Sequence, residues 1–299
     1  MGFLVKVHLI DGTYELFRQH FGQVSRHGDS GPNAGAAGVV MSTLQLVAEG
    51  ATHVGVASDH TIRSFRNDLW PGYKTEEGMP VELLAQIPVM ESALQAAGFT
   101  VWPMVELEAD DALGSAAAVA AADPRVEQVL IVTPDKDLGQ CVVGRRVVQY
   151  DRRKGEIIDE AGVIAKFGVP PSSIADYLGL VGDTADGFPG LSGWGAKSTA
   201  AVLARYGTIE GIPENVNLWD VPGLRGAPKL SATLNADIEL AKLFRHIATI
   251  DLAAEVGAVD DWCWQGPTSG FAGTAATLGS PNLADRATSL AARVARAAQ

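Results

Sequence analysis

Three aspartates directly follow short apolar runs that predict β-strands. Asp11 ends the run VKVHLID, Asp59 ends HVGVASD, and Asp135 ends EQVLIVTPD. Strands that alternate with helices form mainly parallel sheets, and ligands of such sheets bind in the crevice beyond the carboxyl ends of the strands. We therefore expect these three carboxylates to lie at one edge of a sheet, where a site would form.

Six further acids are spaced to join this edge, and they are Glu108, Asp110, Asp111, Asp137, Asp183 and Asp186. The first three lie where a helix is expected to begin after the third predicted strand. Asp137 follows Asp135 with one residue between them, so alternation or a tight turn would aim both side chains the same way. Asp183 and Asp186 are three apart and would share a face if that turn is helical. Any one of these acids is more often a helix cap, a turn residue or a solvated side chain, and only the joint pattern is specific.

Nine carboxylates around one cleft repel one another unless cations bind. Two carboxylates about 4 Å apart repel by roughly 4 kcal/mol at an effective dielectric constant of 20. Oxygen ligands favour Mg²⁺ or Mn²⁺, and the sequence lacks the Cys/His clusters that zinc prefers. Two cations about 3.5–4 Å apart can stabilise the attacking and leaving oxygens of an in-line displacement at phosphorus. The sequence therefore predicts two-metal hydrolysis of phosphodiester bonds.

The elements that must position these acids alternate between strand and helix in the first half of the chain. Predicted strands cover 5–11, 53–59, 99–105 and 127–135, and predicted helices cover 34–50, 80–98 and 109–122. Residues 145–159 predict a β-hairpin around a charged turn. This order indicates an α/β fold with a largely parallel, twisted sheet and flanking helices.

Strand patterns stop near residue 160, and helical patterns follow. They cover 160–167, 172–182, 196–206, 229–247 and 283–298. The stretch 265–281 is rich in Gly, Ser, Thr and Pro, which predicts a loop. We therefore place a nuclease-type core at residues 1–175 and a helical region at residues 176–299.

The charge balance is the main sequence feature that weighs against nucleic-acid binding. The net charge is −12 at pH 7, whereas affinity for phosphate normally comes from Lys and Arg. Nine of the carboxylates belong to the predicted metal group, and removing their charges leaves −3. The basic residues gather in blocks, which are Arg63, Arg66 and Lys74; Arg145, Arg146, Arg152, Arg153 and Lys154; and Lys197. The second block is either a solvated turn or a DNA contact.

Composition and cysteine usage bound the class and the compartment. The chain has 299 residues, of which 47% are hydrophobic, so it can bury the core of one large or two closely packed domains. Cys141 and Cys263 cannot form a disulfide framework, which favours a reducing compartment. We see neither a signal peptide nor a run of about 18 apolar residues, and we expect a cytoplasmic protein that does not bind membranes.

Five blocks, in order along residues 5–255, resemble the bacterial and phage 5′-nuclease family. That family includes the flap endonucleases and the 5′-3′ exonuclease domain of DNA polymerase I, all built on a PIN-like core. The blocks are VHLIDGTYELFR, SDHTIRSFRNDLWPGYK, ELEADDALG, TPDKDLGQ and GDTADGFPGLSGWGAKSTAAVL. Each block is a moderate signal, and five in the family's order are a strong one. The chain has no room for a polymerase domain, so the resemblance implies a stand-alone 5′-nuclease.

The resemblance implies a role for each acid. The residues of the first cation would be Asp11, Glu108, Asp110 and Asp111, with Asp135 shared or adjacent and Asp59 close by. The residues of the second cation would be Asp137, Asp183 and Asp186. Both ions would be Mg²⁺ or Mn²⁺.

The resemblance also implies three catalytic side chains near an arch at about residues 70–90. Lys74 would contact the scissile phosphate, Tyr73 would stack on a base, and Arg66 would belong to the same catalytic block. Without the family, Tyr73 reads equally as a packed aromatic side chain and Lys74 as a solvated lysine.

The Gly-rich segment that follows Asp186 predicts a helix-hairpin-helix at about residues 176–210. Its glycines permit a tight turn with outward-facing amides, and the next helix adds its positive N-terminal end, so the turn can grip a duplex phosphate. The expected DNA contacts are Gly190, Ser192, Gly193, Gly195, Lys197 and Ser198. By resemblance, the carbonyls of Ser192 and Trp194 would hold a K⁺ ion. On local pattern alone, such a segment is usually just a turn.

Three positions depart from the family pattern. Glu77 stands where an arginine often follows the lysine, and an acid there would repel substrate phosphate and weaken threading through an arch. Gly187 replaces the usual Asn, and Ser58 stands where Phe commonly precedes Asp59. We expect the last two changes to be tolerated.

Three functions fit these features. The leading hypothesis is a monomeric, structure-selective 5′-3′ exonuclease or flap endonuclease of DNA replication and repair. Its substrates would be DNA with a 5′ flap, a nick or a 5′ single-stranded end, and RNA primer strands. The alternatives are a PIN-type ribonuclease, disfavoured by the long second half, and a non-catalytic binder of DNA structures, disfavoured by the complete set of acids.

Overall fold

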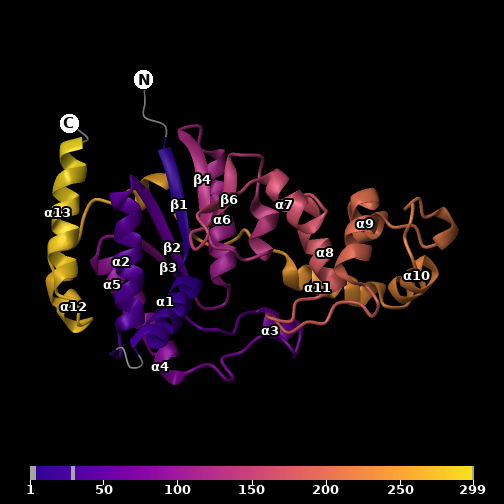
Figure 1. The fold of residues 1–299 in the computed structure, drawn as a ribbon, viewed down its shortest axis with the longest axis horizontal. Helices are drawn as coiled ribbons and strands as arrows, with labels where there is room; N and C mark the ends of the chain where they lie inside the picture. Colours follow the sequence, from indigo (N-terminus) through magenta and orange to yellow (C-terminus); the bar gives the residue numbers. More distant parts are fainter. Residues whose placement is uncertain (1–4, 28–30, 298–299) are drawn as a thin grey trace. The chain divides into compact units, whose positions relative to one another are not determined.

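The computed structural model describes residues 5–27 and 31–297, and the chain divides into two compact units (Figure 1). The first unit contains Met1–Ile62, Glu76–Thr133 and Leu252–Gln299, and the second contains Arg63–Thr75 and Pro134–Asp251. The sequence suggested a single boundary after residue 175. The two units instead alternate along the sequence, because the last segment of the chain packs with the first segment in one unit.

The first unit is built on four parallel strands in the order β3-β2-β1-β4. They are β1 (Val5–Asp11), β2 (His53–Asp59), β3 (Thr100–Met104) and β4 (Val126–Val132). The strand order runs outward from β1 to β3 and then returns to β4 on the other side of β1. This reversal creates a topological switch point between the carboxyl ends of β1 and β4, which is where open α/β sheets bind ligands.

Helices cover both faces of these strands. The connections from β1 to β3 run through α1 (Gly12–His27), α2 (Ala34–Ala48), α4 (Val81–Leu84) and α5 (Gln86–Ala96), which pack on one another. The connection from β3 back to β4 runs through α6 (Ala109–Ala122), which contacts all four strands. Connections between parallel strands are right-handed. Because the connection from β3 to β4 runs across the sheet in the opposite direction to the earlier ones, α6 lies on the face opposite to α1, α2 and α5 (Figure 1).

The C-terminal segment completes the first unit. Trp264 donates its indole N–H to the carbonyl of Ala97 at 2.9 Å, and Trp262 packs edge-on against Trp102 of β3. The segment contains the 3₁₀ turn η5 (Val259–Trp262) and the helices α12 (Phe271–Thr277) and α13 (Asn282–Ala297). The predicted loop at 265–281 is therefore wrong in part. Burial of Phe271 and Ala275 stabilises α12 despite its weak helical composition.

The second unit consists mainly of helices around an aromatic core. Its helices are α3 (Arg66–Leu69), α7 (Glu160–Phe167), α8 (Ile174–Val181), α9 (Ala196–Tyr206), α10 (Ala227–Ala236) and α11 (Ile238–Ala248). Its 3₁₀ turns are η1 (Asp137–Cys141), η2 (Pro171–Ser173), η3 (Ile209–Gly211) and η4 (Val216–Leu218). The hairpin predicted at 145–159 is confirmed as β5 (Val147–Asp151) paired with β6 (Glu156–Ile158). Phe188 stacks on Phe244 at the centre of the core.

The α/β fold with a helical C-terminal region is confirmed, and the differences concern boundaries. The single helix predicted at 229–247 is two helices that meet at Asp237. The helix at 80–98 is broken near Ala85, and α1 was not predicted. Among the described residues, the structure has no helix with the length and apolar character needed to cross a lipid bilayer.

Candidate active site

Asp11 lies at the switch point of the first unit. It is the last residue of β1 and is buried. One carboxylate oxygen accepts a hydrogen bond from the backbone N–H of Tyr14 at 2.8 Å, and the other accepts from the hydroxyl of Thr133, just beyond β4, at 3.1 Å. These two bonds orient the Asp11 carboxylate across the carboxyl ends of β1 and β4.

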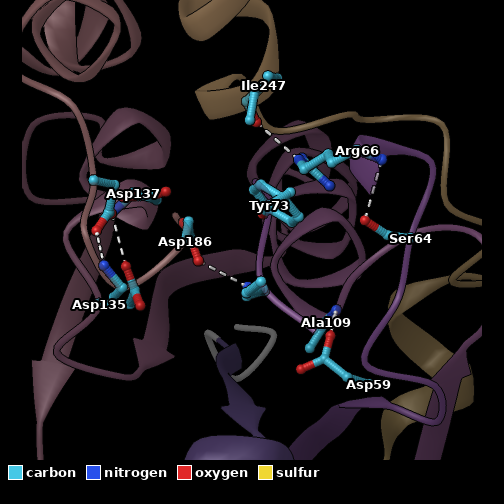
Figure 2. Close-up of polar contacts among 12 residues, drawn as sticks. Asp59, Ser64, Arg66, Tyr73, Ala109, Asp135, Asp137, Asp186 and Ile247 are labelled. Carbon is cyan, nitrogen blue, oxygen red and sulfur yellow. Dashed lines mark hydrogen bonds and ion pairs between the residues drawn. The ribbon is translucent and has the colours of Figure 1, made fainter. Parts of the chain in front are cut away.

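Asp59 is tied to the elements on both sides of it. Its backbone N–H donates to the hydroxyl of Thr13 at 2.8 Å, next to the end of β1. Its carboxylate accepts from the backbone N–H of Ala109 at 2.8 Å, at the start of α6 (Figure 2). The ends of β1 and β2 and the first turn of α6 are therefore connected by side-chain hydrogen bonds.

The N-terminus of α6 presents three acids. Glu108 is the N-cap residue, and its backbone N–H donates to the carboxylate of Asp111 at 2.9 Å. Glu108 and Asp111 are buried, whereas Asp110 is half-buried. The positive end of the helix dipole favours carboxylates at this position, so the first turn of α6 can hold acids that the sheet edge alone would repel.

Glu91 is a supporting residue that sequence reasoning missed. This buried side chain on α5 accepts from the hydroxyl of Ser58 at 2.7 Å and contacts the imidazole of His60 at 2.8 Å. Glu91 therefore holds both residues that flank Asp59. The signals in the sequence were the unusual Ser58 and a lone acid on the apolar side of a predicted helix.

In the second unit, Asp135 and Asp137 lie on one tight turn. The backbone N–H of Asp137 donates to the carboxylate of Asp135 at 2.9 Å (Figure 2), and the 3₁₀ turn η1 begins at Asp137. Two glutamines fix this turn. Gln149 donates to the carbonyl of Asp135, and Gln140 donates to the carbonyls of Asp137 and Ala248 at 2.8 and 2.9 Å. Of the two geometries considered for these acids, the structure has the tight turn.

Asp183 and Asp186 are brought together by a turn that is not helical. Asp183 and Phe188 exchange two backbone hydrogen bonds of 2.8 and 3.0 Å, which close the turn. One carboxylate oxygen each from Asp137, Asp183 and Asp186 lie within 4.8 Å of one another. The expected juxtaposition is present, although the geometry that produces it differs from the one we considered.

Gly187 explains one departure from the family pattern. Its φ is +83°, and a Cβ added there would lie 2.0 Å from the carbonyl oxygen of Gly72. The turn is also anchored by the indole of Trp70, which donates to the carbonyl of Gly187 at 3.1 Å, and by the N–H of Lys74, which donates to the carbonyl of Asp186 at 3.0 Å. Only glycine fits this close approach, which accounts for the residue at this position.

Two lysines form ion pairs with the acids of the second unit. The ammonium of Lys136 lies 2.5 Å from a carboxylate oxygen of Asp183, and that of Lys74 lies 3.1 Å from Asp186. Burial lowers the pKa of Lys136, but the hydrogen bond to Asp183 and the charges of Asp183, Asp137 and Asp135 outweigh this effect and raise it. The lysines thus supply positive charge next to the acids.

Asp137 is the least compensated carboxylate of this group. It is 7% exposed, and its Oδ1 atom finds no hydrogen-bond partner among the described residues. Burial raises the pKa of Asp137 well above its usual range, and the charges of Asp135, Asp186 and Asp183 raise it further. A buried carboxylate oxygen without a partner is costly, and a divalent cation would satisfy it.

The structure places two of the expected catalytic residues in structural positions. Arg66 is buried and donates to the carbonyls of Ile247 and Thr249 at 2.8 and 3.1 Å, at the C-terminal end of α11 (Figure 2). Tyr73 is 4% exposed and belongs to the core of the second unit. This geometry favours a capping role for Arg66 and a packing role for Tyr73 over the catalytic roles expected from the sequence. Lys74 remains partly exposed.

The predicted helix-hairpin-helix consists of α8, a glycine turn and α9. Gly190 is buried against the backbone of Gly182, with φ +67°, and Trp194 anchors the turn by donating to the carbonyl of Leu230 at 3.2 Å. The expected contacts Ser192, Gly193, Gly195 and Lys197 are exposed, whereas Ser198 caps α9 through Gly195. A lysine in the first turn of a helix opposes the helix dipole, so Lys197 does not stabilise α9 by its charge.

Comparison with known proteins is consistent with this geometry. Residues 6–168 match the family described as 5′-3′ exonuclease, N-terminal resolvase-like domain, and residues 169–269 match 5′-3′ exonuclease, C-terminal SAM fold. The chain belongs to the 5′-3′ exonuclease family.

Relatives of the chain include both long and short proteins. DNA polymerase I of Bacillus caldotenax is 31% identical over 268 residues, which are 87% of this chain but 30% of that protein. The chain thus spans between 24% and 30% of the length of the polymerases it matches. The 5′-3′ exonuclease of Aquifex aeolicus is 31% identical over 252 residues, 83% of this chain and 85% of the relative.

A solved structure shares the fold. The bacteriophage T5 D15 flap endonuclease, in a pseudo-enzyme-product complex with DNA and metal ions, superposes with a TM-score of 0.63. It is 20% identical and covers 95% of this chain and 97% of its own.

Proposed function

We propose that this protein is a divalent-metal-dependent 5′-3′ exonuclease and flap endonuclease that hydrolyses DNA phosphodiester bonds near 5′ ends. The observation that carries the proposal is the group of three aspartates in the second unit, which place one carboxylate oxygen each within 4.8 Å of one another. Asp137, one of the three, also has a buried Oδ1 atom that finds no hydrogen-bond partner among the described residues. Membership of the family and the five acids of the first unit support it.

Each unit would hold one Mg²⁺ or Mn²⁺ ion. Asp11, Glu108, Asp110 and Asp111 would hold the first, with Asp135 shared or adjacent and Asp59 close by. Asp137, Asp183 and Asp186 would hold the second. When bound, the two cations polarise the scissile phosphate and lower the pKa of the attacking water. The oxygen-only donor set fits these hard cations.

Residues of the chain itself would carry out the remaining steps. The backbone N–H groups of Tyr14 and Ala109 fix the carboxylates of Asp11 and Asp59 before substrate arrives, so that little reorganisation is needed during reaction. The ammonium of Lys74, which is paired with Asp186 in this structure, is the side chain that would contact the scissile phosphate.

The glycine turn between α8 and α9 would bind duplex DNA through phosphates. Its exposed amides and Lys197 would contact one strand without reading bases, and carbonyls such as those of Ser192 and Trp194 would accept a K⁺ ion. The substrates would be 5′ flaps, nicks, 5′ single-stranded ends and RNA primers in replication and repair. We infer that the chain acts as a monomer in the cytoplasm, where Cys141 and Cys263 stay reduced.

A cleavage assay with three substrates and two metal conditions tests this proposal. The protein is incubated with a labelled 5′-flap DNA, a matched single strand and an RNA hairpin, in Mg²⁺ or in EDTA. We expect short 5′ products from the flap in Mg²⁺ only. Cleavage confined to RNA would replace the proposal with a ribonuclease, and retention of the flap without product would replace it with a DNA-structure binder.

A further inference from the structure

The C-terminal helix α13 and the end of α2 enclose a cavity of about 620 Å³ in the first unit. Three of its lining residues are arginines of α13, namely Arg286, Arg293 and Arg296, and Gln45 and Ala48 of α2 line the other side. The three arginines are exposed, while Leu283 and Ala287 of the same helix are buried and Leu290 is buried at the wall of the cavity. The cavity therefore concentrates positive charge in a protein with a net charge of −12.

The spacing of the arginines puts them on one face of the helix. At about 100° per residue, positions 286, 293 and 296 fall within an arc of about 80°. With a rise of about 1.5 Å per residue, they extend over about 15 Å along the axis. A nucleic-acid strand carries one phosphate per about 3.4 Å of helix axis, so this row matches about four successive phosphates.

The arginines are held by neutral groups. Arg286 donates to the side-chain oxygen of Gln45, and Arg293 donates to the carbonyl of Ala48 at 3.4 Å. None of the three forms an ion pair with any carboxylate among the described residues. The neighbouring acid, Glu49, accepts from Gln45 at 2.9 Å. Three uncompensated guanidinium groups on one face repel one another, and an anion in the cavity would remove this cost.

The cavity lies away from the acids of the first unit. Ala48 ends α2, which leads into the amino end of β2, whereas Asp59 is at the carboxyl end of that strand. The six residue steps from His53 to Asp59 correspond to about 20 Å. This length of β2 corresponds to about six nucleotides at 3.4 Å each, so a strand that contacts both places has to be longer than that.

We propose that this cavity, defined by Arg286, Arg293 and Arg296, binds the phosphates of a nucleic-acid strand at a distance from the acidic residues. The guanidinium fork matches phosphate oxygens in a bidentate arrangement, which explains why all three positions carry Arg. This inference rests on the proposed function, because it takes DNA as the ligand. It adds a second anchoring point to that function and requires no role in cleavage.

Fluorescence anisotropy with labelled oligo-dT strands of about 6 and about 24 nucleotides tests the proposal. Ca²⁺ is added as a hard, oxygen-preferring cation for the acidic groups. We compare the parent with the triple variant R286Q/R293Q/R296Q and with the control R125Q/R205Q/R225Q, which removes the same charge from exposed arginines elsewhere. We expect the cavity variant alone to bind the long strand about tenfold more weakly or worse. The slope of log K against log salt concentration should be less steep by about 2, because three phosphate contacts contribute about 0.7 each for a single strand.

Three outcomes would overturn the proposal. Equal losses in the cavity variant and the control would mean that only total charge matters, and unchanged binding by the cavity variant would remove the site. Poly-glutamate and unlabelled DNA are compared as competitors of the long strand. If both displace it at the same concentration of negative charge, the cavity is assigned to an acidic protein segment. Because binding is read without cleavage, failure of the cavity leaves the nuclease assay unaffected, and the absence of flap cleavage by the parent would refute the proposed function alone.

Discussion

The two acidic groups of this protein are stabilised by different means. In the first unit, carboxylates accept hydrogen bonds from backbone N–H groups and a hydroxyl, as Asp11 does from Tyr14 and Thr133, and the N-terminus of α6 supports them. In the second unit, Asp183 and Asp186 pair with the ammonium groups of Lys136 and Lys74. Asp137 keeps a buried oxygen with no hydrogen-bond partner in the part of the chain that the structure describes.

This difference indicates how each group responds to a cation. Backbone amides are fixed by the fold, so they hold the first group in place whether or not a cation is bound. Lysine side chains can turn away, so they can supply charge to the second group and leave when a cation arrives. We therefore expect the first group to be pre-organised and the second to couple cation binding to lysine movement and to stability.

The largest expected effect comes from removing one acid of either group. Asp11→Ala and Asp135→Asn should each reduce cleavage of a labelled 5′ flap by about 10³-fold or more, because bound cations contribute several kcal/mol to the transition state. Binding of the flap, measured by anisotropy, should remain detectable, since the cations act mainly on the transition state. Turnover near the parental rate in either variant would contradict the assignment.

The second prediction concerns Asp137 and pH. Its raised pKa means that the folded state binds more protons than the unfolded state, whose aspartate has a pKa of about 3.9. Stability therefore falls as pH rises from about 4 through the raised pKa, and the loss persists above it. In EDTA, Asp137→Asn should raise Tm relative to the parent, and this difference should grow with pH.

Added Mn²⁺ provides the control for that variant. The parent should gain thermal stability from the cation and the Asn variant should gain less, since ligands that bind only the folded state stabilise it. A Tm difference between the Asn variant and the parent that is constant from pH 4 to 8 would show that burial does not destabilise the charged form of Asp137.

A variant of Lys136 tests whether lysine charge compensates the acids of the second group only. Lys136→Met should lower Tm in EDTA, because Asp183 and Asp137 lose a compensating charge. The same change should raise Mn²⁺ affinity a few-fold, because no ammonium has to leave. Calorimetry measures both affinity and stoichiometry. Weaker Mn²⁺ binding by Lys136→Met would mean that the lysine supports the cation instead of competing with it.

A Glu91 variant tests whether the residues next to Asp59 have to be held in place for the first group to bind a cation. Glu91→Gln should lower Mn²⁺ affinity by about tenfold, in the range measured for residues that orient metal ligands, because a neutral amide holds Ser58 and His60, on either side of Asp59, less tightly than a carboxylate does. Ser92→Ala on the exposed side of the same helix is the matched control. An unchanged Mn²⁺ affinity in Glu91→Gln would leave Glu91 with a packing role only.

The smallest effect is expected at the glycine turn. Lys197→Ala should weaken binding to duplex DNA and reduce the slope of its salt dependence by about 1, as expected for one phosphate contact. The measurement is anisotropy across a range of salt concentrations. A slope equal to that of the parent would remove Lys197 from the interface.

The sequence predicted the elements well where hydrophobic periodicity was strong. The strands that end at Asp11 and Asp59 begin and end where predicted, because buried parallel strands read as continuous apolar runs. Helix α12 was missed because its Gly and Thr content resembles a loop, and burial of Phe271 against the first unit decides its structure. Local composition cannot report such long-range packing.

The acids were predictable, and the residues that hold them were not. Nothing in the spacing of TPDKD indicates that Lys136 pairs with Asp183, because that contact depends on a turn 47 residues away. Glu91 is likewise 33 residues from Ser58. Arg66 was predicted to be catalytic because its block resembles the family, whereas in the structure its guanidinium donates to the carbonyl groups at the end of α11.

Titration of the parent protein with Mn²⁺ in a calorimeter tests the central claim most directly. The account predicts uptake of two cations per chain, with one lost in Asp11→Ala and the other in Asp137→Asn. If the folded parent, verified by its thermal transition, takes up no Mn²⁺, then the converging carboxylates do not form a metal centre.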